Sequence, residues 1–221
     1  MVDFAAARRM MVDGQVRTSD VSDLRIIAAM LNIPRERFVP AEQAAVAYLD
    51  RDVMVTGSST PPRYLLKPMV LAKLIQAAEI EETDRVLDVA CATGYSSAVL
   101  AHLAGSVVAL EEDTGLAQTA GRLFKQLGIE HTSVAVGPLS AGSPAGAPYD
   151  AIVLNGAFEV VPRTLLAQLK NGGRLVGITG AGPDGKAVVF RSVNDTFSSR
   201  PIFDATAPLL PGFVAPAAFV F

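Results

Sequence analysis

The residues best suited to chemistry are two acidic side chains that flank a turn of small residues. Asp88 lies in the apolar run 85–89, the turn 90–95 follows it, and Glu111 ends the next apolar run. A small-residue turn lets backbone N–H groups and a helix N-terminus approach a ligand. An acid about twenty positions after such a turn can accept hydrogen bonds from both ribose hydroxyls. A third segment, 136–140, would flank an adenine ring, so the order predicts a nucleoside-type ligand.

Each of these features, taken alone, also has an ordinary structural explanation. A strand, a turn with one glycine and a helix occur in many α/β proteins. The acidic run 111–113 is typical of a helix start, where the helix dipole favours negative charge. It is the joint order of acid, turn and acid that favours a ligand site.

The other reactive side chains receive structural interpretations. Cys91 is the one cysteine, so no intramolecular disulfide can form, and we expect a small buried thiol. His102 and His131 lack metal-ligand spacing, and we expect no metal. Lys67 is either a solvated residue at a helix end or an attractor for a substrate carboxylate.

The elements that must position these residues alternate between strand and helix after residue 84. Apolar runs in such alternation predict an α/β fold with a doubly wound, mostly parallel sheet covered on both faces, in which ligands bind beyond the carboxyl ends of the central strands. Strands are expected at 85–89, 106–112, 131–136, 149–156, 174–179, 187–193 and 213–221. Helices are expected at 96–103, 116–128 (ended by Gly128) and 163–170 (ended by 171–173).

The first 80 residues are expected to be mainly helical. Ser22 or Asp20 would cap a helix with one buried face, made of Leu24, Ile27, Ala28 and Leu31. A short helix is expected at 41–50, and a longer one at 65–80 with Pro68 in its first turn. The polar stretch 56–64 reads as a loop.

Composition excludes several classes of protein. The net charge is −3, which argues against a nucleic-acid-binding surface. The uncharged stretches 132–149 and 205–221 are broken by Gly, Pro or Ser, so we expect no membrane span. One compact unit in the cytoplasm is expected, as a monomer or alternatively a weak dimer.

Longer segments resemble the protein-L-isoaspartate O-methyltransferase family over nearly the whole chain. They are "AAMLNIPRERFVP", "AYLDRDV", "RVLDVACATGYSSAVLA", "VVALEED" and "APYDAIVLNGAFEVVPRTLLAQLKNGGRLV". The resemblance implies a class I, Rossmann-like methyltransferase fold with seven strands and a helical N-terminal extension. It also implies methyl transfer from S-adenosyl-L-methionine to the side-chain carboxylate of L-isoaspartyl residues in damaged peptides or proteins. Residues 1–80 would form the N-terminal region with a substrate and lid segment, and 81–221 the cofactor-binding domain.

The resemblance also assigns residues. The cofactor would contact Asp88, Ala90, Ala92, Gly94, Tyr95, Glu111, Gly137 and Pro138. The family usually has glycine where Ala90 and Ala92 stand, and an aspartate where Pro138 stands. Alanine at the first two positions costs little at negative φ and is strained at positive φ.

The largest departure from the family is upstream of the sheet. The family places a serine or threonine hydroxyl, close to the reacting carboxylate, where this chain has Leu66, and a histidine where it has Met69. The candidate hydroxyls near the acceptor are then Ser59 and Thr60, with Ser58 beside them. The segment 56–68 is expected to form a lid over the cofactor.

Three functions remain open from the sequence. The first is isoaspartyl carboxyl methylation, slowed or altered by the change at Leu66. The second is a non-catalytic or altered-substrate relative that binds the cofactor or a protein weakly. The third is a nicotinamide-dependent enzyme, which would need a closer G-x-G-x-x-G match than 90–95 provides.

Overall fold

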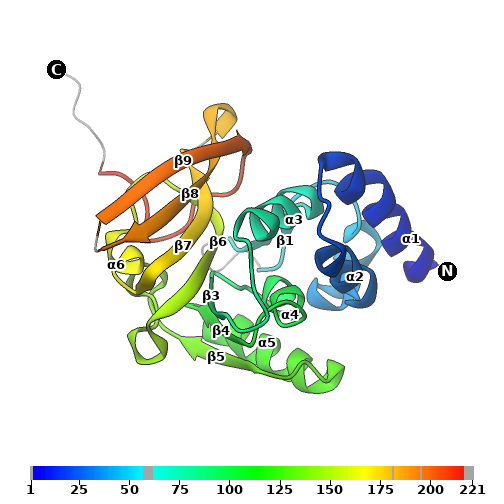
Figure 1. Cartoon of the computed structure of the whole chain (residues 1–221). Helices are drawn as coiled ribbons and strands as arrows, with labels where there is room; N and C mark the ends of the chain where they lie inside the picture. Colours follow the sequence, from blue (N-terminus) through cyan, green and yellow to red (C-terminus); the bar gives the residue numbers. More distant parts are fainter. Residues whose placement is uncertain (1, 57–61, 181, 195, 217–221) are drawn as a thin grey trace.

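The computed structural model describes residues 2–56, 62–180, 182–194 and 196–216. A seven-stranded sheet with the strand order β5-β4-β3-β6-β7-β8-β9 forms its centre (Figure 1). The strands from β5 to β7 pair in parallel, whereas β8 and β9 pair antiparallel. The predicted fold class is therefore confirmed. The chain leaves β3 towards β4 on one side and later returns to β6 on the other, which places the switch point of the sheet between β3 and β6.

The strands of the main sheet have these bounds: β3 Arg85–Val89, β4 Ser106–Glu111, β5 Thr132–Val136, β6 Tyr149–Phe158, β7 Leu169–Thr179, β8 Lys186–Val193 and β9 Thr196–Asp204. A separate antiparallel pair consists of β1 (Val53–Met54) and β2 (Tyr64–Leu65). The predicted strand at β3 has the observed bounds, and those at β4 and β5 differ from the observed bounds by one residue.

Two apolar clusters cover the two faces of the sheet, because alternate residues of each strand point to opposite sides. One face packs against α3 (Pro68–Ala77), α4 (Tyr95–Leu100), α5 (Thr114–Leu127) and the N-terminal helices. The other face packs against α6 (Arg163–Leu166) and the segment 208–213 (Figure 1). Asp113 caps α5 by accepting from two backbone N–H groups, and Gly128 ends it at φ +63°, as predicted from the sequence.

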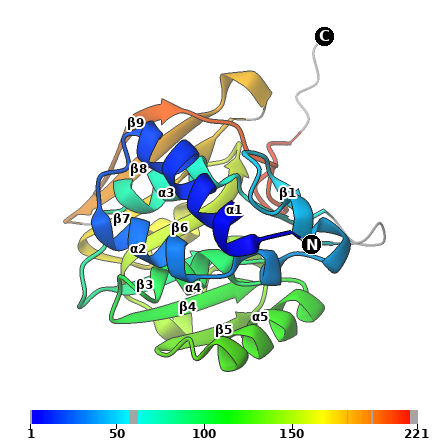
Figure 2. The ribbon, with the colours of Figure 1, turned by 90° about the vertical axis from the view of Figure 1, so that its right-hand side faces the viewer.

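The N-terminal region is helical, as expected, and packs beside α3 and α4 (Figure 2). It contains α1 (Phe4–Met11), α2 (Leu24–Asn32) and tight helical turns at Arg35–Phe38 and Ala41–Val46. The last of these replaces the helix predicted at 41–50. The helix predicted at 65–80 is shorter than expected: α3 covers Pro68–Ala77, with Pro68 in its first turn as predicted, and Leu65 belongs to β2.

Two predictions for α2 were wrong. Asp23, and neither Ser22 nor Asp20, is the cap, because its carboxylate accepts from the N–H of Arg25. The buried residues of the helix are Ile26, Ile27, Ala29 and Met30. Leu24 is 71% exposed, and Ala28 is exposed as well. Apolar residues occur on several faces of this helix, so periodicity alone could not select the buried one.

The C-terminal half differs from the predictions in two places. The helix predicted at 163–170 stops at Leu166, because β7 already begins at Leu169 and pairs with Tyr149 of β6. The last strand is β9, at 196–204, and residues 213–216 form no strand. The remainder of the predicted strand 213–221 lies outside the described residues.

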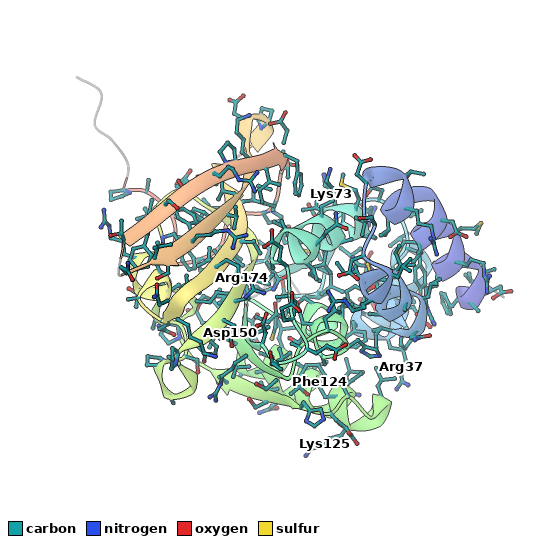
Figure 3. All side chains as sticks on the ribbon, in the orientation of Figure 1. Arg37, Lys73, Phe124, Lys125, Asp150 and Arg174 are labelled. Carbon is teal, nitrogen blue, oxygen red and sulfur yellow. The ribbon has the colours of Figure 1, made fainter. Side chains whose placement is uncertain are left out.

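An arginine of the sheet holds the end of α3 (Figure 3). Arg174 of β7 donates to the carbonyl oxygens of Ala78 and Glu79 and to the carboxylate of Asp84, at 2.5 Å from the last. Its side chain is 9% exposed. One apolar cluster continues from the N-terminal helices into the sheet, and the functional division near residue 80 stays a prediction. Within the described ranges, no helix has both the length and the apolar character needed to cross a membrane.

Candidate functional site

The carboxyl ends of three neighbouring strands meet at one edge of the sheet. The N–H of Cys91, after β3, donates to the carbonyl of Leu110 in β4 at 3.1 Å. The N–H of Gly137, after β5, donates to the carbonyl of Glu111 at 3.2 Å. The three segments predicted to surround a nucleoside therefore lie side by side. The parallel pairing of β3, β4 and β5 is the reason.

The turn after β3 has a strained backbone. Ala90 and Ala92 have φ of +60° and +53°, and Gly94 has φ of +94°. L-residues rarely adopt these angles, so the two alanines are in the strained case considered from the sequence. At Gly94 a side chain is excluded as well, since an added Cβ would lie 2.6 Å from the ring of Phe124 in α5. The turn therefore keeps the backbone path that glycine would give.

Asp88 points into the protein and holds the start of α4. It is fully buried, and its carboxylate accepts from the hydroxyls of Ser96 and Ser97 at 2.7 and 2.5 Å. Asn155 follows the residue of β6 that pairs with Val89, and it donates to the other oxygen at 2.6 Å and to the carbonyl of Val89. Burial raises the pKa of Asp88 to about 6. The sequence analysis missed Asn155, although the rule that ligands gather at strand ends applies equally to β6.

Glu111 links the turn to the end of β4. Its Oε2 accepts from the N–H of Ala92 at 2.9 Å. Its Oε1 accepts from the N–H groups of Glu112 and Asp113 at 2.8 and 3.1 Å. The side chain is fully buried. A carboxylate in this position is fixed by the backbone N–H groups around it.

Arg63 provides the remaining partner of Glu111. Its Nε donates to Oε1 of Glu111 at 3.1 Å, and its Nη2 lies 3.4 Å from Glu112. The arginine side chain is 5% exposed. The sequence analysis missed this residue because the two partners are 48 positions apart and no local pattern connects them.

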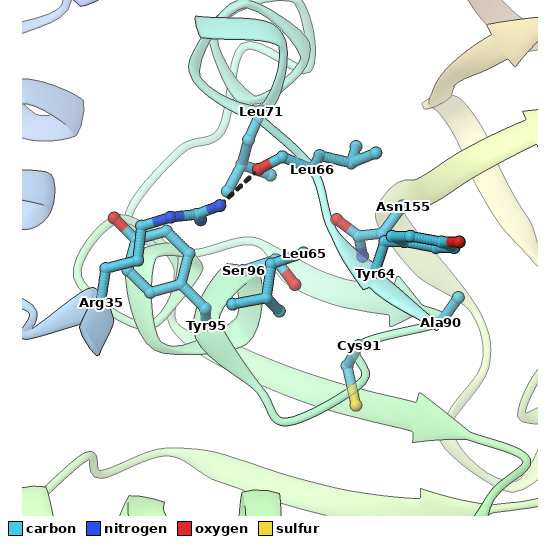
Figure 4. Close-up of a pocket in the computed structure, with 10 residues that line it drawn as sticks. All are labelled: Arg35, Tyr64, Leu65, Leu66, Leu71, Ala90, Cys91, Tyr95, Ser96 and Asn155. Atoms are coloured by element: carbon cyan, nitrogen blue, oxygen red, sulfur yellow. Dashed lines mark hydrogen bonds between the residues drawn. The ribbon is translucent and has the colours of Figure 1, made fainter. Parts of the chain in front are cut away.

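The segment around Leu66 lines a small cavity together with the β3–α4 turn. Leu66 is 2% exposed, and its carbonyl accepts from Nη2 of Arg35 at 2.8 Å (Figure 4). Arg35 is fully buried, and its guanidinium lies 4.7 Å from the ring centroid of Tyr95. The ring of Tyr95 therefore packs against Arg35. Its hydroxyl has no hydrogen-bond partner among the described residues. The candidate hydroxyls Ser58, Ser59 and Thr60 and most of the expected lid lie outside the described residues.

The other residues singled out in the sequence have few contacts that point to a ligand. Pro138 precedes a short helical turn at 139–141, and an added Cβ on Gly137 would meet no atom within 4 Å, so this edge is open. Cys91 is buried, as expected, and burial raises the pKa of its thiol. Lys67 caps α3, and its N–H donates to Asp52. In the part of the chain that the structure describes, no group of three His, Cys, Asp or Glu side chains could hold a metal ion.

The sequence profile of the family "Protein-L-isoaspartate(D-aspartate) O-methyltransferase (PCMT)" matches residues 7–199. The chain belongs to this family. The protein-L-isoaspartate O-methyltransferase 1 of Rhodopseudomonas palustris (strain HaA2) is 37% identical over 186 residues, which cover 84% of this chain and 74% of that protein. The protein-L-isoaspartate O-methyltransferase of Roseiflexus castenholzii is 34% identical over 212 residues, 96% of this chain and 95% of its own length.

Solved structures agree with this assignment. A protein-L-isoaspartate O-methyltransferase superposes with a TM-score of 0.81 at 25% identity, covering 93% of this chain and 66% of that one. A putative relative from Plasmodium falciparum, solved in complex with S-adenosyl-L-homocysteine, gives 0.77 at 15% identity, covering 95% of this chain and 99% of its own, and supports the fold. As a member of the PCMT family, the chain is an S-adenosylmethionine-dependent protein carboxyl methyltransferase of the L-isoaspartyl repair type.

The residues predicted to bind the cofactor lie together at the carboxyl ends of β3, β4 and β5, with an open edge at Gly137. However, the cavity that touches Ala90 and Cys91 measures about 10 Å³, room for about one water molecule. Sites for small organic ligands usually enclose about 300 Å³ or more. This cavity alone is therefore too small for the cofactor, and neither Glu111 nor Gly137 lines it.

Proposed function

We propose that this chain binds S-adenosylmethionine between the β3–α4 turn and Glu111. The turn 90–95 would face the amino-acid and ribose portions, Glu111 the ribose hydroxyls, and Gly137 and Pro138 the adenine. Asp88 would fix the turn through its bonds to α4 and Asn155. The observation that carries the proposal is the 2.9 Å hydrogen bond from the N–H of Ala92 to Glu111, which directs the turn and the acid into one crevice.

The proposed reaction is methylation of L-isoaspartyl side chains in peptides and proteins. The cofactor supplies an activated methyl group on a sulfonium, and a carboxylate can accept it without a general base. The protein's contribution is then mainly to orient the two reactants and exclude water. This explains why the site needs few reactive side chains.

Calorimetric titration with S-adenosylhomocysteine tests the cofactor site. We expect Glu111→Ala to weaken binding by about 1–3 kcal/mol, because hydrogen bonds from the ribose to a charged acceptor are lost. Glu130→Ala is the matched control, since its side chain is 84% exposed and it precedes the amino end of β5, whereas the site lies at the carboxyl ends of the strands. Equal affinity of wild type and Glu111→Ala would remove Glu111 from the site.

A second candidate is a relative that keeps the fold but not the reaction. The observation in its favour is Leu66 at the position where the family resemblance predicts a hydroxyl. Absence of measurable binding to S-adenosylhomocysteine would favour it. A titration with NAD tests the nicotinamide alternative in the same experiment.

A further inference from the structure

A cleft of about 230 Å³ lies between the N-terminal region and α5, beside the β3–α4 turn. The N-terminal region contributes the segment 37–40 and Val55 to its lining, and the turn contributes Thr93. The helix α5 contributes Leu116, Thr119 and Arg122. The cleft therefore borders the proposed cofactor site without including Glu111 or Gly137.

Two arginines at this cleft converge on one neutral atom. Nη2 of Arg37 donates to Oε1 of Gln126 at 3.0 Å, and Nη1 of Arg122 donates to the same oxygen at 3.5 Å. Arg122 and Gln126 are one turn apart on α5, whereas Arg37 reaches them from the helical turn Arg35–Phe38 (Figure 3). The shared oxygen carries no net charge. Two guanidinium groups are thus held close together in a way that an added carboxylate or phosphate would stabilise.

The neighbouring acidic residues are bonded elsewhere. Glu36 precedes Arg37 but pairs with Arg8, and both of these side chains are largely buried, at 13% and 15% exposed. Asp113 accepts from backbone N–H groups at the start of α5. Among the described residues, neither Arg37 nor Arg122 forms an ion pair, and no acidic residue lines the cleft. The positive charge of the cleft is therefore not neutralised by the part of the chain that the structure describes.

The cleft has a fixed position relative to the β3–α4 turn. The hydroxyl of Thr93 donates to the carbonyl of Phe38 at 2.5 Å, and Phe38 directly follows Arg37. On the other side, the backbone at Gly94 lies against α5, the helix that carries Arg122. Both arginines are thus on segments that pack against the turn.

The chemistry of the cleft fits an acidic side chain of a polypeptide. A carboxylate can accept paired N–H groups from a guanidinium and can bridge two of them. The apolar residues Phe38, Val39 and Leu116 line the cleft beside the arginines, which favours a carboxylate carried on a carbon chain over a bare inorganic anion. Sites for whole small organic ligands usually enclose about 300 Å³ or more. The smaller volume here fits a single side chain.

We propose that the cleft between Arg37 and Arg122 binds a glutamate or aspartate side chain of the protein substrate, on a residue close to the isoaspartyl residue. This inference rests on the proposed function, because that function brings a polypeptide to the β3–α4 turn. The two arginines then determine specificity and do not touch the reacting atoms. Charges at an exposed site act mainly by selecting the partner.

The test measures binding of fluorescently labelled isoaspartyl peptides by anisotropy, with S-adenosylhomocysteine present. Two peptides of one sequence are compared, which carry either glutamates or glutamines beside the isoaspartyl residue. We expect wild type to bind the glutamate peptide about fivefold more tightly, and the double variant Arg37→Gln, Arg122→Gln to bind both peptides equally. Arg51→Gln is the matched control and should keep the preference. Arg51 is also an exposed arginine bonded to a glutamine, Gln43, but it does not line the cleft.

A charge reversal provides a second readout. In Arg122→Glu, the glutamate peptide should bind more weakly than the glutamine peptide, because like charges then meet in the cleft. Arg122 is exposed, so the change leaves the core intact. A preference for glutamate as large as that of wild type would contradict the proposal.

Other outcomes would also overturn the acidic docking site. One is a wild type without any preference, and another is a preference that survives in the double variant. Equal weakening of both peptides overturns it as well, since the arginines would then act on the fold or the cofactor. Calorimetric titration with inorganic phosphate is the remaining arm. Phosphate that binds wild type more tightly than the glutamate peptide does would assign the cleft to a free anion.

Methyl transfer to the same peptides separates this inference from the proposed function. Methylation of both peptides with equal KM overturns the docking site and leaves the proposed function standing. A glutamate preference that depends on the arginines, without S-adenosylhomocysteine binding or methyl transfer, has the opposite meaning. It supports the docking site for acidic polypeptides and overturns the proposed function.

Discussion

The two alanines of the β3–α4 turn have backbone angles that favour glycine. Ala90 and Ala92 have φ of +60° and +53°. Their methyl groups are buried, at 2% and 1% exposed. The strain of an L-residue at such angles is about 1–2 kcal/mol, and part of it would be removed by glycine. The chain thus keeps the turn at a cost in stability, which indicates that the fold around it determines its path.

We predict that Ala90→Gly and Ala92→Gly are less harmful than an ordinary alanine-to-glycine change. Glycine relieves the left-handed strain, whereas it only adds chain entropy at negative φ. The control is Ala28→Gly, at an exposed position inside α2, which should lose about 1 kcal/mol of unfolding free energy. Chemical denaturation should place each turn variant at least about 1 kcal/mol above this control. Equal losses at all three positions would show that the turn is unstrained.

The buried carboxyl of Asp88 predicts a pH dependence of stability. Its pKa is raised to about 6 from an ordinary value of 3.8, chiefly by burial. The folded protein therefore binds more protons than the unfolded chain between about pH 4 and pH 6. The contribution of Asp88 to stability is largest below pH 4 and is lost as the pH rises through 6, by on the order of 3 kcal/mol.

Comparison with Asp88→Asn isolates this contribution. The variant should lack the decrease in unfolding free energy between pH 4 and pH 6.5 that wild type owes to Asp88. Asp23 and Asp150, whose pKa values are lowered, act in the opposite direction in both proteins and cancel in the difference. Parallel curves of unfolding free energy against pH for the two proteins would contradict a raised pKa at Asp88.

At the scale of elements, the sequence predicted best the strands and helix ends that have a local signal. The strand β3 and the helix end at Gly128 were found from an apolar run and a left-handed glycine, which are local signals. The helix predicted at 163–170 ends at Leu166, because residues 169 and 170 belong to β7, which pairs with β6. Tertiary pairing overrode the local pattern there.

In the candidate site, too, residues with a local sequence signal were predicted and partners distant in the sequence were missed. The positions of Glu111, Gly94 and Gly137 followed from strand ends, because parallel strands bring their carboxyl ends together. The partners Arg63 and Asn155 could not be found so directly. Arg63 reaches Glu111 only through the packing of a segment that precedes the sheet, and distance along the chain carries no information about that contact.

The junction of α3 with the sheet depends on Arg174. This arginine satisfies two carbonyl groups at the end of α3 and pairs with Asp84, with both side chains 9% exposed. We predict that Arg174→Ala lowers the unfolding free energy by about 3–5 kcal/mol, because it leaves a buried carboxylate and two carbonyls without their partner.

Arg191 provides the matched control for this junction. It pairs with Arg174 across β7 and β8, and it bonds the exposed carboxylate of Glu79 with its own side chain 42% exposed. Arg191→Ala should cost less than about 1 kcal/mol. If urea denaturation gave similar losses for the two variants, the junction would not depend on the buried pair.

At the scale of the whole molecule, the N-terminal region and the sheet meet at Leu66. Its carbonyl fixes Arg35, and Arg35 in turn packs on Tyr95 in α4. The side chain is 2% exposed, so the position now serves packing between the two parts of the chain. The resemblance to the family predicts a hydroxyl near the acceptor carboxylate at this position, and this chain has an apolar side chain there.

We predict slow methylation of isoaspartyl peptides by the wild type, and a partial gain with Leu66→Ser. A site that lacks the partner of a substrate's polar group loses discrimination, because the desolvated carboxylate stays unpaired. Leu66→Ala is the matched control. Both changes remove a buried leucine and should destabilise the fold by about 2–5 kcal/mol, but only serine restores a hydroxyl. The measurement is transfer of a radiolabelled methyl group to an isoaspartyl peptide, with the aspartyl peptide of the same sequence as background. Equal rates for the serine and alanine variants would show that the hydroxyl at this position does not govern the reaction. A wild type as fast as a relative with the family hydroxyl would show that other groups of the chain orient the acceptor.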